Sequence, residues 1–260
     1  MRIVIKVGTS TLAHTGGRLN IRRVELLCKV LSDMKNAGCE IILVSSGAIG
    51  MGVGKLGLPG RPEDMPGKQA AAAIGQCELM YTYDKLFAEY NHTVAQILLT
   101  ADDIDDKRRS SHVHDALERL LHWGVLPIIN ENDAVAIDEI GIHTTIGEND
   151  SLSAVVAKLV GADLLVLLSD IDGLYTEDPR KNPNATLISE VREITPDILA
   201  LAGSAGTSLG SGGMATKLKA AQLSINAGID MVIANGENPE KLYALLEGEN
   251  IGTRFIGRSL

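Results

Sequence analysis

Short runs of Ile, Val and Leu recur along the chain, and they constrain its fold more than any other feature. The runs lie at residues 3–7, 41–44, 94–99, 125–129, 164–168 and 231–234. They are largely continuous, without the alternation of polar and apolar residues that a strand with one solvated face shows. Continuous apolar strands are typical of a parallel sheet that is covered on both faces.

Between most of these runs lie stretches with the spacing of amphipathic helices. In residues 21–37, for example, Val24 and Leu27 fall on one face. Asn20 precedes this stretch as an N-cap, and Gly38 follows it as a C-cap. The expected helices span residues 21–37, 70–90, 104–122, 150–160 and 214–227. Because strands alternate with helices, we expect a three-layer α-β-α sandwich with a mainly parallel central sheet.

The composition excludes several classes of protein. The chain has 260 residues, of which 45% are hydrophobic, so it can bury a large core. No stretch approaches the roughly 20 continuous apolar residues of a membrane span. The first residues also lack the pattern of a signal peptide. We therefore expect a cytoplasmic protein that does not enter a membrane.

Charge and cysteine usage narrow the range of partners. The formal net charge is −9 and only 3% of residues are aromatic, so the chain lacks the basic patch and stacking rings that nucleic-acid binding needs. Cys28, Cys39 and Cys77 are odd in number and have no CxxC spacing. This pattern disfavours a disulfide framework or a cysteine-based zinc site, and it favours reduced, packed thiols.

Three short motifs match known patterns but lack the context that those patterns need. Residues 52–57 fit the dinucleotide pattern GxGxxG, yet the preceding strand ends too early, which favours a glycine-rich helix or loop. Residues 206–210 fit the hydrolase pattern GxSxG, but the last histidine, His143, precedes them. His112 and His114 lie in a helical stretch, where residues two apart do not share a face, so solvated side chains are favoured over a metal site.

Polar residues gather at the expected carboxyl ends of the strands, where open α/β sheets bind ligands. Lys6 lies near the carboxyl end of the first run, and an apolar strand tolerates a lysine only if it has an anionic partner or snorkels to solvent. Ser46 and Gly47 follow the second run and lead into a helix. Their backbone N–H groups form either an anion site or simply a tightly packed turn.

The later strand ends carry similar alternatives. Residues 130–133 offer oxygen acceptors that suit an ammonium group or merely cap a turn. Asn149 and Asp150 begin a helix, where capping is their ordinary role. Residues 210–217 form a glycine-rich segment that ends in Lys217, one turn into a helix. Such a segment can grip phosphates without the sequence of a P-loop.

Five segments together give the chain a family resemblance. They are Lys6-x-Gly8-Thr9-Ser10, Ser46-Gly47-Ala48, Asn130-Glu131-Asn132-Asp133-Ala134-Val135, Asp172-Gly173-Leu174-Tyr175-Thr176-x-Asp178-Pro179-Arg180 and Gly212-Gly213-Met214-x-Thr216-Lys217. The set resembles the amino acid kinase superfamily, and the likeness extends from about Lys6 to Phe255. The second and third segments are most similar to the branch that acts on glutamate.

The resemblance implies ATP-dependent phosphorylation of the γ-carboxylate of L-glutamate to γ-glutamyl phosphate, the first step of proline biosynthesis. It implies catalytic roles for Lys6, Lys217 and Asp150, with Asp150 holding the two lysines. The implied glutamate-binding residues are Ser46, Asp133 and Asn149. ATP binding is implied for Lys6, Ser169, Asp170, Ser211, Gly212, Gly213, Met214, Ala215, Thr216 and Lys217. Mg²⁺ would bridge the ATP phosphates, without dedicated protein ligands.

The resemblance also carries expectations about organisation. We expect a single domain over residues 1–260, with a glutamate-binding lobe to about residue 160 and an ATP-binding lobe from about 161. Many members of this branch carry a C-terminal PUA domain, and we expect none here. A dimer or tetramer and feedback inhibition by proline are further expectations. The competing hypotheses are a related kinase acting on UMP or N-acetylglutamate, and a non-catalytic amino-acid sensor.

Overall fold

All six apolar runs form strands, as predicted. The computed structural model describes residues 1–14, 18–135, 149–202 and 213–257. The six strands are β1 (Arg2–Val7), β2 (Glu40–Ser45), β3 (Val94–Leu99), β4 (Leu126–Glu131), β5 (Leu164–Ser169) and β7 (Asp230–Asn235). Two short strands that the sequence did not predict complete the sheet in the described part of the chain, β6 (Glu190–Val191) and β8 (Gly252–Phe255).

The strands form one sheet in the order β3-β4-β2-β1-β5-β7-β8-β6. Pairing is parallel from β3 through β7, which confirms the prediction of a mainly parallel sheet. At one edge β8 runs antiparallel to β7 and β6 pairs with β8 in parallel, so both strands run against the rest. β1 lies inside the sheet between β2 and β5, and it carries the first of the predicted site residues, Lys6.

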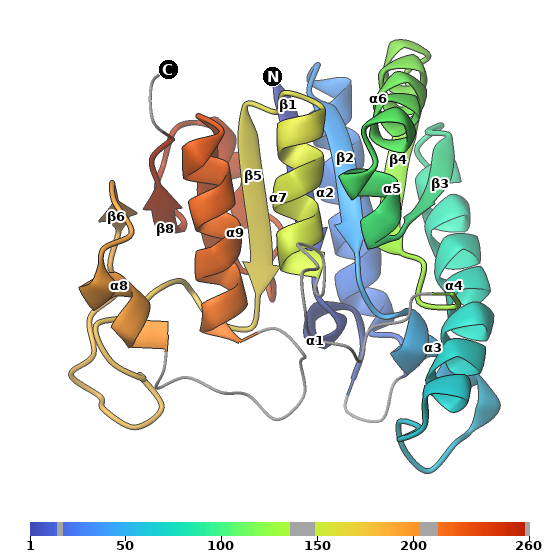
Figure 1. The fold of residues 1–260 in the computed structure, drawn as a ribbon, viewed down its shortest axis with the longest axis horizontal. Coiled ribbons are helices and arrows are strands. Elements are labelled where there is room, and N and C mark those ends of the chain that lie inside the picture. The colour runs from blue at the N-terminus through green and yellow to red at the C-terminus, as the bar shows by residue number, and fades with distance from the viewer. Residues whose placement is uncertain (15–17, 136–148, 203–212, 258–260) are drawn as a thin grey trace.

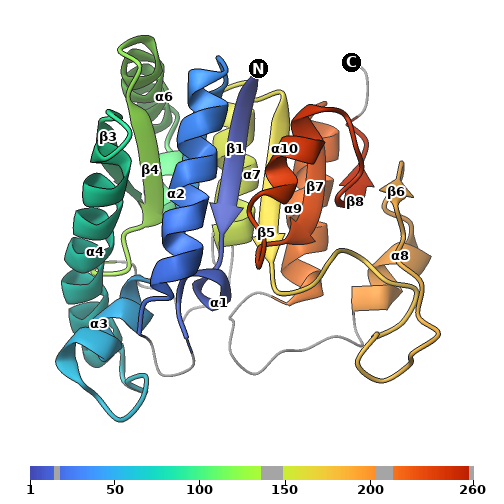
Figure 2. The same ribbon diagram turned by 180° about the vertical axis from the view of Figure 1, so that it is seen from behind.

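Helices cover both faces of the sheet, so the three-layer sandwich is confirmed. One face packs against α6, α7 and α9 (Figure 1), and the other packs against α2, α4 and α10 (Figure 2). The helices of the described residues are α1 (Thr9–Leu12), α2 (Ile21–Asn36), α3 (Ala48–Leu56), α4 (Met65–Ala88), α5 (Ala101–Asp105), α6 (Lys107–His122), α7 (Asn149–Leu159), α8 (Pro196–Leu201), α9 (Met214–Asn226) and α10 (Lys241–Leu246).

The prediction of one helix over residues 104–122 is wrong. The helix is interrupted at Asp106, whose carboxylate accepts a hydrogen bond from the backbone N–H of Arg109 and so caps the start of α6. The helix predicted from residue 70 begins earlier, because Asp64 caps α4 by accepting from the backbone N–H of Gly67. Local capping side chains therefore set both boundaries, where apolar spacing alone did not.

The glycines of residues 52–57 belong to α3 and its end, so the GxGxxG match is not a strand-to-helix turn. A Cβ atom on Gly52 would lie 1.9 Å from the carbonyl oxygen of Ala71, and one on Gly75 would lie 1.7 Å from that of Ala48. Only glycine permits so close a backbone approach. These two positions hold α3 against α4, and through α3 they fix the turn that follows β2.

That turn begins at Ser46 and Gly47. Gly47 has a φ of +108°, a conformation that residues with a Cβ rarely adopt, and it directly precedes α3. The backbone N–H of Ser46 donates to the carbonyl oxygen of Val7, which ties the end of β2 to the end of β1. Ser46 is thereby placed at the carboxyl edge of the sheet.

The order in which strands are added to the sheet reverses at the centre of this edge. From β1 the chain passes to β2 on one side, whereas β5 pairs with β1 on the other. α7 and α9 both begin at the edge where β1 and β5 end (Figure 1). Ligands of open α/β sheets bind at such a switch point.

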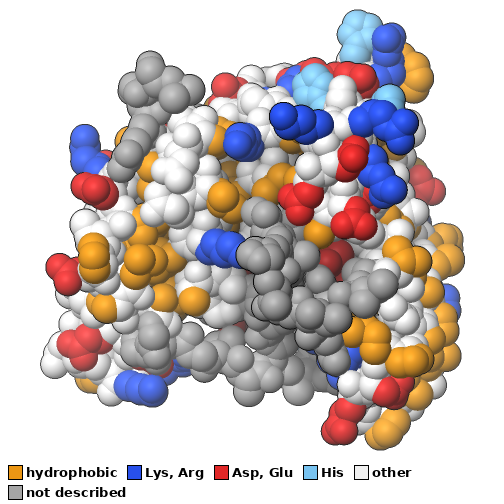
Figure 3. Space-filling view, in the orientation of Figure 1, with side chains coloured by type: hydrophobic (Ala, Val, Ile, Leu, Met, Phe, Trp, Pro, Cys, Tyr) orange, Lys and Arg blue, Asp and Glu red, His pale blue; other side chains and the backbone are white. Residues whose placement is uncertain are grey.

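The net charge of −9 is not gathered into one patch on the face shown in Figure 3. Acidic and basic side chains stand intermixed in the region over α5 and α6. None of the helices in the described residues has the length and apolar character needed to cross a membrane.

Candidate active site

Lys6 and Asp150 meet at the carboxyl edge of the sheet. Side chains alternate along a strand, so Lys6 shares its face with Val4, on the side covered by α7 and α9. Its Nζ lies 2.6 Å from Oδ1 of Asp150, which stands in the first turn of α7. The lysine therefore has the anionic partner that its place in an apolar strand requires.

α9 brings two more groups to the same carboxylate. Lys217 Nζ donates to Oδ2 of Asp150 at 3.1 Å, and the Thr216 hydroxyl lies 2.9 Å from the same oxygen. Thr216 Oγ1 also lies 2.8 Å from the carbonyl oxygen of Gly213, the N-cap residue of α9. The first turn of α9 therefore fixes the position of this hydroxyl. One carboxylate thus joins β1 to α9 across the switch point.

This cluster is almost fully removed from solvent. The exposed fractions of Asp150, Lys6 and Lys217 are 1%, 8% and 6%. Burial alone would raise the pKa of Asp150, but the charges of Lys6 and Lys217 and their hydrogen bonds outweigh it and hold that pKa below its ordinary value. Asp150 is therefore ionised at neutral pH and keeps two cations close together.

A second group of polar side chains lies beside this cluster. Asn149, which precedes Asp150 in α7, donates from Nδ2 to Ser46 Oγ at 2.7 Å and to Asn130 Oδ1 at 3.0 Å. Asn130 in turn donates from Nδ2 to Gln76 Oε1 at 2.9 Å. The structure thus brings together two of the three predicted glutamate-binding residues, Ser46 and Asn149.

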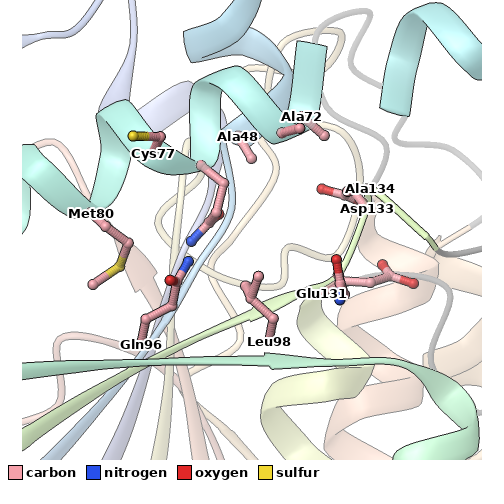
Figure 4. A pocket seen from close by; sticks show the side chains of 12 residues that line it. Ala48, Ala72, Cys77, Met80, Gln96, Leu98, Glu131, Asp133 and Ala134 are labelled. Carbon is pink, nitrogen blue, oxygen red and sulfur yellow. The ribbon is translucent and has the colours of Figure 1, made fainter. Parts of the chain in front are cut away.

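Asp133, the third, lines an adjacent cavity of about 370 Å³. Across this cavity Cys77 and Met80 of α4 face Gln96 and Leu98 of β3, and Asp133 stands toward its other end with Glu131 and Ala134 (Figure 4). Asp133 therefore lines a space of the size that a small molecule occupies. Ala48, next to the Ser46 turn, also lines the cavity.

The described residues among the predicted nucleotide-binding set lie near the end of β1, at the end of β5 and at the start of α9. Ser169 ends β5 and donates from Oγ to Oδ1 of Asp170 at 3.2 Å, while its carbonyl oxygen accepts from the backbone N–H of Gly236. Gly213, Met214 and Ala215 form the start of α9. Ser211 and Gly212 lie outside the described residues.

Gln76 is a buried polar residue that the sequence reasoning missed. It lies in α4, whose buried residues are otherwise largely apolar, including Ala72, Leu79 and Tyr83. A polar side chain at helical spacing within an apolar stripe is a signal that the sequence does contain. Its partner Asn130 was noted only as one member of a polar run.

Among the described residues, no group of three or more His, Cys, Asp or Glu side chains is arranged to hold a metal ion. Asp150 already serves two lysines, so it is not offered to a cation. Mg²⁺ sites that include substrate phosphates need only one or two carboxylates from the protein.

Two solved kinase structures have the same fold. Carbamate kinase from Giardia lamblia bound to AMP-PNP superposes with a TM-score of 0.67 at 18% identity, covering 99% of this chain and 98% of that one. The isopentenyl phosphate kinase product complex of T. acidophilum gives a TM-score of 0.65 at 19% identity, and the match covers 98% of this chain and 100% of that one. At these identities the likeness establishes the fold.

Sequence relatives establish more. A glutamate 5-kinase of Clostridium perfringens is 54% identical over 257 residues, which are 99% of this chain and 96% of the relative. A glutamate 5-kinase of Listeria monocytogenes is 52% identical over 257 residues, covering 99% of this chain and 93% of the relative. The amino acid kinase family matches residues 1–235. The two lysines paired with one buried aspartate thus lie in a chain that belongs to the amino acid kinase family.

Proposed function

We propose that this protein transfers the γ-phosphoryl group of ATP to the γ-carboxylate of L-glutamate, giving γ-glutamyl phosphate and ADP, the first step of proline biosynthesis. The main structural support is the buried cluster in which Asp150 pairs with Lys6 and Lys217 at the switch point of the sheet. The 54% identity to a glutamate 5-kinase along nearly the whole chain supports glutamate as the acceptor.

The reaction needs positive charge more than proton transfer. A γ-carboxylate with a pKa of about 4.3 is ionised at neutral pH, so no general base is required. One of its oxygens attacks the γ-phosphorus of ATP, and the bond from that phosphorus to the β–γ bridging oxygen breaks as ADP leaves. Lys6 and Lys217 offset the negative charge of the two approaching anions and of the transferring phosphoryl group.

Asp150 organises these two lysines. Its carboxylate contacts both ammonium groups, that of Lys6 from β1 through Oδ1 and that of Lys217 from α9 through Oδ2. Such fixed charges need no reorganisation when the phosphoryl group moves. Asp150 is therefore a positioning residue for the two lysines.

Glutamate is proposed to bind between the Ser46 turn and the cavity that Asp133 lines. The Asp133 carboxylate suits the α-ammonium group, while Ser46 and Asn149 lie beside Asp150, where the γ-carboxylate must arrive. In this proposal the acceptor binds over the half of the sheet formed by β1, β2 and β4.

ATP is proposed to bind over the other half, at the ends of β5 and the start of α9. The candidate residues are Lys6, Ser169, Asp170, Ser211, Gly212, Gly213, Met214, Ala215, Thr216 and Lys217. When bound with the nucleotide, Mg²⁺ supplies further neutralisation of the phosphate charges. A homo-oligomer, inhibition by proline and a cytoplasmic location stay predictions.

An acceptor panel tests the proposed function. ADP release is measured with ATP and Mg²⁺ in the presence of L-glutamate, N-acetylglutamate or UMP. The proposal expects release that depends on L-glutamate. Release with UMP or N-acetylglutamate in its place would assign a related kinase, and release with none of them would favour an amino-acid sensor.

A further inference from the structure

Four buried or half-buried polar side chains form a hydrogen-bonded row, called the polar chain, that runs from α4 to the end of β2. Gln76 Oε1 accepts from Asn130 Nδ2 at 2.9 Å, Asn130 Oδ1 accepts from Asn149 Nδ2 at 3.0 Å, and Asn149 Nδ2 donates to Ser46 Oγ at 2.7 Å. The chain links the wall of the 370 Å³ cavity to the neighbour of Asp150.

One backbone group fixes the direction of this chain. The N–H of Glu131 donates to Asn130 Oδ1 at 2.9 Å, and a backbone N–H can only donate. The acceptor end of the Asn130 amide must therefore face Glu131 and Asn149, and its donor end must face Gln76. It follows that Asn149 presents its donor end, Nδ2, to Asn130 and Ser46.

This direction determines which groups remain for a ligand. Both Nδ2 hydrogens of Asn149 are used, so Ser46 Oγ accepts and its own hydroxyl hydrogen is left to donate. Asn149 Oδ1 is buried and has no hydrogen-bond partner among the described residues. Beside Asp150 the polar chain thus leaves one donor, the Ser46 hydroxyl, which suits a carboxylate. It also leaves one acceptor, Asn149 Oδ1, which suits an ammonium group.

Folding alone does not require such a chain. Gln76 and Asn130 are 8% and 2% exposed, and buried amides cost free energy that apolar side chains of similar size would not. The Gln76 Nε2 atom is itself buried without a partner among the described residues, which adds to that cost. A methionine at this position of α4 would continue the apolar stripe of Ala72 and Leu79.

We propose that Gln76 is a positioning residue: by accepting from Asn130 it holds the Asn130 amide in place, and so keeps Asn149 and Ser46 aimed toward an amino-acid substrate. This inference rests on the proposed function. Gln76 also lines the cavity, so the alternative is a direct contact with the substrate, which would make its effect independent of Asn149.

A double-mutant cycle tests this dependence. The values of kcat/KM for glutamate are compared for wild type, Gln76→Met, Asn149→Ala and the double variant. Gln76→Met is expected to lower kcat/KM by about tenfold in the wild-type background, the effect of one lost hydrogen bond, and by less than about twofold in the Asn149→Ala background. Gln96→Met is the matched control, because Gln96 lines the same cavity outside the chain. Its effect is expected to be equal in both backgrounds.

Several results would overturn the inference. They are an equal effect of Gln76→Met in both backgrounds, no effect in the wild-type background, or a parallel rise in the KM for ATP. Thermal unfolding of each variant, with Gln76→Leu as a second substitution, identifies a loss of fold, which would make Gln76 a structural residue. A wild-type protein that does not turn over glutamate would instead reject the proposed function before the cycle is run.

Discussion

The Nζ atom of Lys6 lies 2.6 Å from Oδ1 of Asp150, so the central strand of the sheet is joined to the first turn of α7 through a buried ion pair. The other carboxylate oxygen of Asp150 takes Lys217 from α9. Two cations from distant parts of the chain are held at one place because a single carboxylate serves both. Mutation of one lysine and mutation of the shared carboxylate should therefore affect catalysis and folding differently.

Lys217→Ala is expected to lower kcat by about 100- to 1,000-fold, because one fixed charge in a water-excluded site can contribute about 2.7–4 kcal/mol to the transition state. Asp150 retains Lys6, so the melting temperature should change little. Steady-state kinetics and thermal unfolding check both statements. Lys219→Ala, on the exposed face of the same helix, is the control and should keep its activity. Near-normal turnover by Lys217→Ala would remove Lys217 from the mechanism.

Asp150→Asn is expected to lower the free energy of unfolding by about 3 kcal/mol at pH 7, because two buried lysines lose their counter-ion. The pKa of Asp150 is held below its ordinary value of 3.8, so its stabilisation is complete above that pH and is lost as the pH falls through the lower, folded-state value. Urea titrations from pH 7 downward should show a constant difference from wild type that narrows only below about pH 4. A difference that already narrows near pH 6 would contradict the direction of the pKa shift.

Asp133→Ala is expected to raise the KM for glutamate, with the KM for ATP nearly unchanged, because the cavity wall loses the carboxylate proposed for the α-ammonium group. A change of about tenfold or more corresponds to one charged hydrogen bond. Initial-rate kinetics in both substrates measures it. Asp84→Ala, on the exposed side of α4, is the control. If the glutamate KM stays the same, the ammonium group is bound elsewhere.

Gly52→Ala is expected to destabilise the protein by about 3 kcal/mol or more, because the added Cβ would lie 1.9 Å from the carbonyl oxygen of Ala71 and push α3 away from α4. Gly60→Ala is the matched control, since a Cβ there meets no atom within 4 Å. That change should be neutral or stabilising by up to about 1 kcal/mol. Chemical denaturation of both variants compares them, and equal stabilities would mean that α3 and α4 do not depend on this close approach.

The sequence predicted β1, β2, β3, β4, β5 and β7 because each is a nearly continuous apolar segment. It did not predict β8, where Thr253 and Arg254 interrupt the apolar residues and only pairing with β7 creates the strand. The two-residue β6 depends in the same way on β8. Edge strands that exist through their neighbours leave little periodicity to detect.

The candidate site was only partly predictable. Lys6 in an apolar strand required an anionic partner, but spacing alone could not choose Asp150 among the chain's carboxylates. The family resemblance made that choice, and the structure places the two side chains in contact. Gln76 escaped notice because one polar residue in a helix has no local chemistry until Asn130 is seen to bond to it.

The most direct test of the central claim is trapping of the acyl phosphate with hydroxylamine. Wild-type protein, ATP, Mg²⁺ and L-glutamate are incubated with hydroxylamine, and the product is identified by mass spectrometry. The account predicts ATP-dependent γ-glutamyl hydroxamate, strongly reduced with Lys6→Met or Lys217→Ala. If folded protein that binds nucleotide does not form this product, phosphoryl transfer to glutamate is contradicted.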